Sequence, residues 1–249
     1  MENVGRRLGQ HFLKSESALR RTAEAACPDQ AQLEPLVIEI GPGRGALTQH
    51  LVSRCQRLIA IEVDPPLAAH IREKFPTVEV VEASVLDVDL GQWGPAVIAG
   101  NLPYYITSPI IEQTLQAPFL RAVFLVQKEV AVRLTAASGS RDYGYLSVAT
   151  QSQAKVDYCF TVPAKAFAPP PKVDSAVVRL SPLSPFVPCG IREPEFLKFA
   201  SACFRQKRKM LRNNLAEGYP AIADTPEATL RAEQLTVPQL QALWRRLVS

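Results

Sequence analysis

The sequence predicts an α/β fold: a parallel sheet with an antiparallel hairpin at its edge, followed by a small all-α C-terminal domain. Five short apolar runs alternate with amphipathic segments between residues 36 and 137, a pattern typical of βα units with right-handed crossovers. Two later strand-like runs flank a proline-rich segment, and every element expected beyond residue 185 is a helix. A chain of 249 residues is long enough for one large and one small domain.

The first helix follows Ser15 or Ser17, either of which can cap it, and ends at Ala26. The strands of the parallel sheet are expected over residues 36–40, 58–63, 78–82, 96–99 and 122–127. The intervening and following helices are expected from the glycine turn to Arg54 and over 66–74, 106–117, 128–137 and 146–154. The hairpin strands are expected over 155–162 and 176–181.

Prolines at 182, 185 and 188 indicate a linker between two domains. A long helix over 195–215 and short helices over 226–233 and 237–248 are expected beyond it. The sequence therefore predicts a sheet domain over residues 1–184 and a helical domain over residues 185–249.

Composition favours a soluble globular protein with a polyanionic partner. Hydrophobic residues make up 47% of the chain and charged residues 21%. The net charge is +4, and residues 1–189 hold 18 basic and 18 acidic side chains, so the whole surplus lies in the last sixty residues. The chain has no membrane-length apolar run, no secretory signal and no paired cysteines, so we expect a cytoplasmic protein without membrane association.

A glycine-rich turn with Gly41, Gly43 and Gly45 follows the first strand of the sheet. The third glycine comes one residue earlier than in the dinucleotide fingerprint, which fits an adenosine-type ligand without pyrophosphate better than NAD. Glu62 ends the next strand, where a carboxylate can accept hydrogen bonds from both ribose hydroxyls. The alternatives are a structural turn and a surface acid that caps the following helix.

The stretch from Asn101 to Tyr104 follows the fourth strand, where ligands bind in open α/β sheets. The Asn101 side-chain oxygen and the Leu102 carbonyl can accept the hydrogens of an exocyclic adenine amine, while Tyr104 offers a flat face to a flipped base. Phe167, next to three prolines, is a candidate for the other face of that base. The alternatives are an ordinary turn for the first stretch and core packing for Phe167.

A basic run in the C-terminal domain is a candidate for phosphate contact. We expect it to lie on the helix over 195–215, and the alternative is a solvated helix end. It comprises Arg205, Lys207, Arg208, Lys209 and Arg212. The three histidines form no spaced cluster, so no metal site is expected.

Together these residues resemble the bacterial small-subunit rRNA adenine N6,N6-dimethyltransferases. The resemblance runs from Gly9 almost to the C-terminus. It rests on residues 9–13 (GQHFL), 38–43 (IEIGPG), 100–104 (GNLPY), 126–130 (VQKEV) and 167–178 (FAPPPKVDSAVV). The last two segments are much more specific than the glycine turn.

The resemblance implies a class I, Rossmann-like S-adenosyl-L-methionine methyltransferase that dimethylates two adjacent adenines near the 3′ end of 16S rRNA, within the 30S subunit or its precursor. We expect it to act as a monomer. By similarity the cofactor contacts are His11, Leu13, Gly41, Glu62, Ser84 and Asn101, and the adenine pocket comprises Asn101, Leu102, Tyr104 and Phe167.

Two residues depart from the family pattern, which usually has Asn where His11 stands and Asp where Ser84 stands. We therefore expect weaker cofactor binding than in a relative with Asp. The competing functions are a 23S rRNA methyltransferase of the macrolide-resistance type and a non-catalytic ribosome assembly factor. An NAD-dependent dehydrogenase is disfavoured by the glycine spacing.

Overall fold

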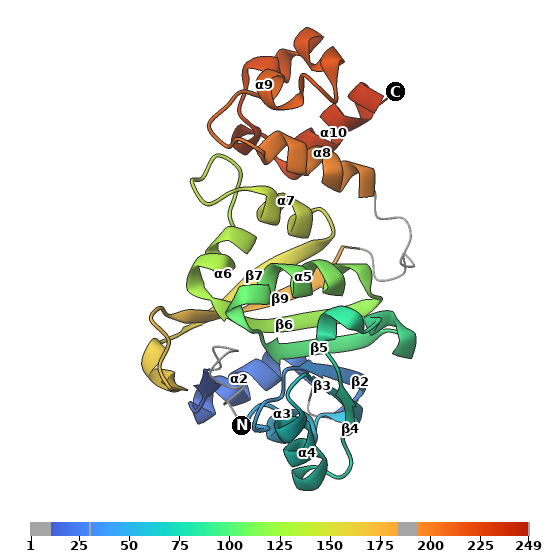
Figure 1. Ribbon diagram of the computed structural model, residues 1–249, viewed down its shortest axis with the longest axis vertical. Coiled ribbons are helices and arrows are strands. Elements are labelled where there is room, and N and C mark those ends of the chain that lie inside the picture. The colour runs from blue at the N-terminus through green and yellow to red at the C-terminus, as the bar shows by residue number, and fades with distance from the viewer. Residues whose placement is uncertain (1–10, 30, 184–193, 249) are drawn as a thin grey trace.

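The computed structural model describes residues 11–29, 31–183 and 194–248. The molecule is elongated, with the sheet domain at one end and helices α8–α10 at the other, as Figure 1 shows. The cysteines described are all free thiols.

A seven-stranded sheet has the order β4-β3-β2-β5-β6-β9-β7. Five strands of this sheet are parallel: β2 (Glu34–Ile40), β3 (Cys55–Glu62), β4 (Glu79–Glu82), β5 (Ala96–Asn101) and β6 (Phe119–Gln127). The hairpin strands β7 (Ala154–Val162) and β9 (Ser175–Pro182) are antiparallel, and β9 lies between β6 and β7. The structure confirms the predicted sheet and its edge hairpin.

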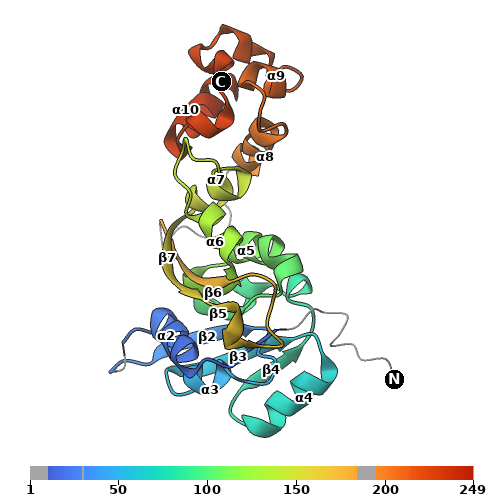
Figure 2. The same cartoon turned by 90° about the vertical axis from the view of Figure 1, so that its left-hand side faces the viewer.

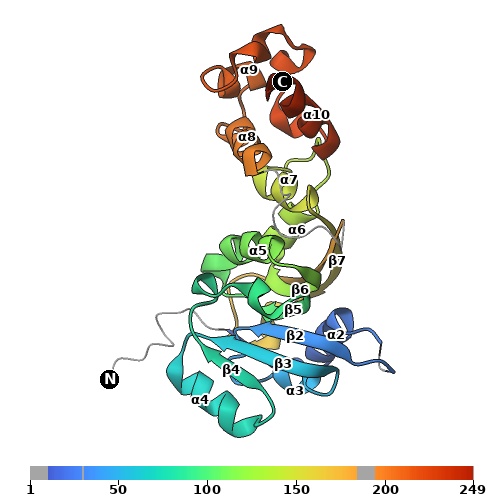
Figure 3. The ribbon, with the colours of Figure 1, turned by 90° about the vertical axis from the view of Figure 1, so that its right-hand side faces the viewer.

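Helices cover both faces of the sheet because its strands alternate between two apolar clusters. Val37 and Val97 face the cluster that holds α2 (Glu16–Ala26), α3 (Thr48–Leu51) and α4 (Pro65–Lys74). Ile38 and Ile98 face the cluster that holds α5 (Thr107–Gln116) and α6 (Lys128–Leu134). The turned views of Figure 2 and Figure 3 show these two layers on either side of the sheet.

The helix after the glycine turn is shorter than expected. Gly41, Gly43 and Gly45 all have positive φ, so the chain turns until residue 47, and α3 spans only four residues. The loop after β4 holds two short 3₁₀ helices, η1 (Val85–Asp87) and η2 (Leu90–Trp93), which Ser84 and Asp89 cap. A third, η3 (Tyr104–Ile106), precedes α5.

The long helix predicted over 195–215 is wrong: the chain forms α8 (Pro194–Phe204), a turn, and α9 (Leu211–Leu215). Asn214 explains the break, because its amide donates to the carbonyls of Cys203 (2.7 Å) and Gln206 (3.2 Å). The Cys203 carbonyl belongs to the last turn of α8, whose carbonyls lack intrahelical partners, so this side chain caps the end of the helix. The chain continues with η5 (Pro220–Asp224), η6 (Pro226–Thr229), η7 (Ala232–Gln234) and α10 (Val237–Val248).

A third apolar cluster joins the two parts of the chain. Ala136, Tyr143 and Val148, which precede β7 in the chain, pack with Phe199 of α8 and Leu243 of α10. Helix α7 (Tyr145–Gln151) thus lies between the sheet and α8, as all three ribbon views show. Of the three prolines expected to mark the linker, Pro182 is instead the last residue of β9, and Pro185 and Pro188 lie outside the described residues.

Candidate active site

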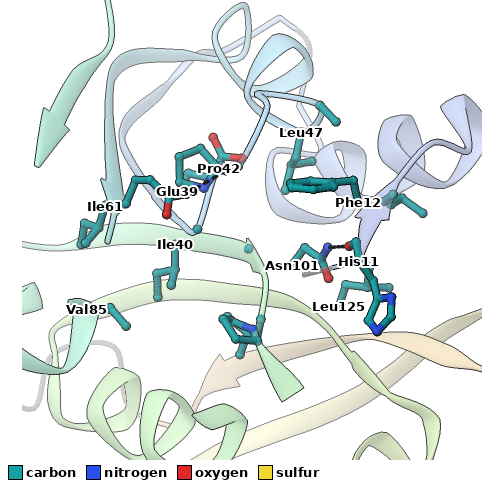
Figure 4. Close-up of a pocket in the computed structure, with 18 of the residues that line it drawn as sticks. His11, Phe12, Glu39, Ile40, Pro42, Leu47, Ile61, Val85, Asn101 and Leu125 are labelled. Carbon is teal, nitrogen blue, oxygen red and sulfur yellow. Dashed lines mark hydrogen bonds between the residues drawn. The ribbon is translucent and has the colours of Figure 1, made fainter. Parts of the chain in front are cut away.

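A cavity of about 450 Å³ opens at the carboxyl ends of β2 and β5 (Figure 4). Strands β3 and β4 lie on the far side of β2, and β6 lies on the far side of β5, so the strand order reverses between β2 and β5. In α/β sheets, ligands bind at such a switch point. The predicted site residues that line it are His11, Leu13, Gly41, Glu62, Ser84, Asn101, Leu102 and Tyr104.

The glycine turn forms one wall of the cavity. A side chain at Gly45 would collide with Phe75, and one at Gly43 would crowd Phe12 at 3.1 Å. Gly100 is required on the neighbouring strand, because its Cβ would lie 2.5 Å from the carbonyl oxygen of Ile40. The close approach at Gly100 lets the backbones of β2 and β5 lie together beside the cavity.

Glu62 is held against the glycine turn by two backbone N–H groups. Its Oε2 accepts from the Gly43 N–H and its Oε1 accepts from the Asp64 N–H, each at 3.0 Å. Burial raises the pKa of Glu62, and these two N–H groups partly offset that rise. Because each carboxylate oxygen has a second lone pair, Glu62 can still accept hydrogen bonds from a ligand.

Glu39 is a second buried carboxylate in the cavity wall, and the sequence reasoning missed it. It is 1% exposed, and its Oε2 has no hydrogen-bond partner in the described structure. Burial raises the pKa of Glu39 from 4.5 to about 8. The available signal was a single acidic residue within the apolar run of residues 36–40.

Asn101 is fixed by the N-terminal segment. Its Nδ2 donates to the backbone carbonyl of His11 at 3.1 Å, the contact drawn in Figure 4. Since a carbonyl only accepts, this bond defines which end of the amide carries the NH₂ group. The Oδ1 atom is left as an acceptor to which no described residue donates.

Tyr104 is anchored at its ring and at its hydroxyl. The His11 ring stacks on it with centroids 5.9 Å apart, and its hydroxyl shares a 2.7 Å hydrogen bond with the buried Ser175 on β9. Burial raises the pKa of Tyr104, so the phenol is neutral at physiological pH. His11 therefore lies beside the proposed base-handling residues Asn101 and Tyr104, and the Leu102 side chain is buried beneath the same turn.

Ser84 borders the cavity, but its hydroxyl already has a structural role. Its Oγ accepts a 3.3 Å hydrogen bond from the Leu86 N–H and caps η1. The hydroxyl hydrogen still allows Ser84 to donate to a ligand.

Phe167 does not lie where the sequence reasoning placed it. It belongs to the two-residue strand β8 (Phe167–Ala168), which pairs with β1 (Phe12–Leu13). Its side chain is 4% exposed, packs in the core on the α2 face, and does not line the cavity. Its apolar ring is more stable in that core than in an open pocket. Leu13, its partner in the pairing, does line the cavity.

The predicted basic helix is also wrong, because most of the basic run lies on the turn between α8 and α9. Arg205 lies 3.8 Å from Glu217, and Lys207 is paired with Glu233 and with the Arg141 carbonyl. Arg208, Lys209 and Arg212 are exposed and have no side-chain partner among the residues described.

Neither a metal-binding group nor a membrane-spanning helix occurs in the described ranges. No three His, Cys, Asp or Glu side chains of residues 11–29, 31–183 and 194–248 are arranged to hold a metal ion. None of the helices in these ranges is both long and apolar enough to cross a bilayer.

The chain matches one protein family and several of its members over most of its length. The model of the family described as "Ribosomal RNA adenine dimethylase" matches residues 1–236. The chain is 45% identical over 258 residues to "Ribosomal RNA small subunit methyltransferase A" of Acidobacterium capsulatum, covering 97% of this chain and 90% of that protein. It is 39% identical to the protein of the same name in Prosthecochloris aestuarii, covering 98% and 94%.

Two solved structures resemble the whole molecule. A dimethyladenosine transferase from Plasmodium falciparum has a TM-score of 0.77 at 24% identity, covering 96% of this chain and 98% of that one. The 23S rRNA methyltransferase ErmE has a TM-score of 0.69 at 30% identity, covering 96% and 100%. The likeness to both structures thus extends over nearly the full chain, with helices α8–α10 included.

Proposed function

Because this chain belongs to the ribosomal RNA adenine dimethylase family, we propose that it uses S-adenosyl-L-methionine to dimethylate the N6 amines of two adjacent adenines near the 3′ end of 16S rRNA. The observation that carries the catalytic part of this proposal is the orientation of Asn101. Its Nδ2 is held by the His11 carbonyl, so Oδ1 is available to accept a hydrogen from the target amine.

The cavity suits a cofactor that carries both an adenosine and a cationic methionine group. Glu62, on the tip of β3 against the glycine turn, would accept from the ribose hydroxyls. Glu39 brings a buried, unpartnered carboxylate oxygen, the group expected opposite a cation. Ser84 and Leu13 would contact other parts of the cofactor, and Gly41 lets it approach the backbone closely.

S-adenosyl-L-methionine supplies an electrophilic methyl group, and the chain supplies the environment for the nucleophile. The amine of adenine is a poor nucleophile because its lone pair is delocalised into the ring. Asn101 Oδ1 and the Leu102 carbonyl would accept its hydrogens and allow the nitrogen to pyramidalise. Tyr104 would hold the flipped base by stacking. Positioning and electrostatics of this kind need no strong general base.

The substrate context forms a second part of the proposal. The exposed cations Arg208, Lys209 and Arg212 would contact rRNA phosphates of the 30S subunit or its precursor. We further propose that the protein works as a monomer in the cytoplasm, with residues 1–184 forming the catalytic domain and residues 185–249 the RNA-binding domain.

Two alternatives remain distinguishable by experiment. The likeness to ErmE favours 23S rRNA as the second candidate substrate. A non-catalytic assembly factor would bind the particle and leave its nucleosides unchanged. Incubating small-subunit particles and 23S RNA separately with protein and cofactor, followed by nucleoside mass spectrometry, separates the three. Our proposal expects N6,N6-dimethyladenosine in the small-subunit rRNA alone.

The variant Asn101→Ala tests the catalytic assignment. We expect turnover to fall by about two to three orders of magnitude, as when a single preorganised polar group is removed from an active site. Gln56→Ala is the matched control, since Gln56 also carries a side-chain amide and is exposed at the amino end of β3, opposite the end of the sheet that holds the cavity. Near wild-type turnover of Asn101→Ala, with a folded protein, would exclude the proposed role.

A further inference from the structure

Two consecutive tyrosines at the cavity have different surroundings. Tyr104 is half-buried, with its hydroxyl on Ser175 and its ring against His11. Tyr105 also lines the cavity, but its side chain is 61% exposed. Both lie in η3, where successive side chains point about 120° apart.

The Tyr105 side chain makes no contact in the described structure that would explain an aromatic residue at this exposed position. In the described structure it makes no hydrogen bond and no ring contact, and it belongs to none of the three apolar clusters. Its ring is therefore a rigid, flat, solvent-exposed surface at the rim of the cavity that receives the target base.

A base that reacts at its exocyclic amine has to leave the stack of its neighbours. The neighbouring nucleotide then loses a stacking partner, and proteins that bind single-stranded RNA commonly offer an aromatic side chain in its place. The rim also carries the exposed cations Lys14 and Arg44, which suit the phosphates of a strand that enters here.

We propose that Tyr105 is a stacking platform for the unpaired nucleobase next to the target adenine. This inference rests on the proposed function, in which that neighbour is the second adenine of the pair. The Tyr104 ring, which His11 and Ser175 hold in place, then faces the reacting base. The exposed Tyr105 ring stacks on the base beside it.

The first test compares Tyr105→Ala, Tyr105→Phe and the control Tyr158→Ala on small-subunit particles. Tyr158 is an exposed tyrosine on the edge strand β7, away from the cavity. We expect Tyr105→Ala to lower kcat/KM by about tenfold, within the range measured for base–aromatic stacking. Tyr105→Phe and Tyr158→Ala should stay within twofold, and the cofactor Kd of all three variants should match the wild type.

The second test removes the neighbouring base instead of the tyrosine. Particles are reconstituted with rRNA that has an abasic nucleotide at one of the two positions, and methylation of the remaining adenine is followed. On these particles we expect kcat/KM of the wild type to fall by the same factor by which Tyr105→Ala lowers it on intact particles. The kcat/KM of Tyr105→Ala should not fall further on the abasic particles. The inference is overturned if the losses in kcat/KM from the variant and from the abasic nucleotide multiply. It is also overturned if kcat/KM of Tyr105→Ala on intact particles stays within twofold of wild type. Absence of dimethyladenosine with wild-type protein on intact particles overturns the proposed function instead.

Discussion

Ser84, which follows β4, has both a structural role and a proposed role in cofactor binding. A serine hydroxyl caps η1 and can still donate one hydrogen bond, but it carries no charge. An aspartate would cap the same 3₁₀ helix, because Asp is at least as good a cap as Ser. It would also offer a charged acceptor to the amine of a bound adenosine.

We expect Ser84→Asp to bind S-adenosyl-L-methionine five- to tenfold more tightly than the wild type. The reason is that a hydrogen bond to a charged group is stronger than one between neutral groups by about 1 kcal/mol. Isothermal titration calorimetry measures the change, with Ser84→Asn as the uncharged control. An unchanged or higher dissociation constant for Ser84→Asp would contradict the assignment of Ser84 to the cofactor.

Glu39 predicts a pH dependence of stability. Its pKa is about 8 in the folded protein, against an ordinary value of 4.5, so between these values the folded chain holds a proton that the unfolded chain lacks. The free energy of unfolding of the cofactor-free protein should therefore fall as pH rises from about 5 to 8. Glu39→Gln lacks this contribution, so its free energy of unfolding should rise relative to that of the wild type over the same pH range.

Urea denaturation at pH 5, 6.5 and 8 checks this expectation. The same variant should bind the cationic cofactor less tightly, because the amide cannot supply a negative charge. A stability difference that does not change with pH would mean that Glu39 is ionised in the fold.

At the scale of elements, the edge strand β9 supports the turn after β5. Ser175 is fully buried at the start of β9, where it pairs with Gln127 and Val162. Its hydroxyl reaches across 71 positions of sequence to the Tyr104 hydroxyl. The specific segment at residues 167–178 thus contains a side chain, that of Ser175, which holds η3 in place.

Ser175→Ala and Tyr104→Phe should each lower turnover, and the double variant should lose little more than either alone. Each change removes the same hydrogen bond, so their effects should not add. Cofactor affinity should be unaffected, because neither hydroxyl is assigned to the cofactor. Kinetics of the four proteins give the coupling directly, and fully additive losses would show that the two groups act independently.

At the scale of the whole molecule, the positive surplus of residues 190–249 is concentrated on one turn. Of the basic run, Lys207 contacts Glu233 and the Arg141 carbonyl, so it ties this turn to the loop before α7. The side chains of Arg208, Lys209 and Arg212 are exposed and available to contact a polyanion. The third apolar cluster, which joins α7 and the loop before it to α8, α9 and α10, fixes the turn relative to the sheet.

Charge reversal of Arg208, Lys209 and Arg212 to Glu should weaken binding to small-subunit particles and make it less salt-dependent. Each lost phosphate contact lowers the slope of log K against log salt by nearly one. Lys198→Glu is the single-charge control, since Lys198 is exposed on α8 and paired with Glu195. Filter binding at several salt concentrations provides the slope, and an unchanged slope would exclude this turn from the RNA interface.

Local patterns were sufficient to predict most of the fold. The strands of the sheet need runs of apolar residues that fill both faces, and these runs are visible in the sequence to within a few residues. The glycine turn, Glu62 and Asn101 could also be found, because each follows directly on a strand that the pattern identifies. Glu39 was missed because it lies inside such a strand.

The order of the βα units and the end of the sheet at which the cavity forms could be read from the amino-acid sequence, since both follow from short-range apolar periodicity and strand polarity. Tertiary structure alone decided the rest. The His11–Asn101 and Tyr104–Ser175 hydrogen bonds, the break at the end of α8 and the burial of Phe167 all depend on partners distant along the chain. Such partners satisfy polar groups and fill the core only after folding brings them together, which no local pattern records.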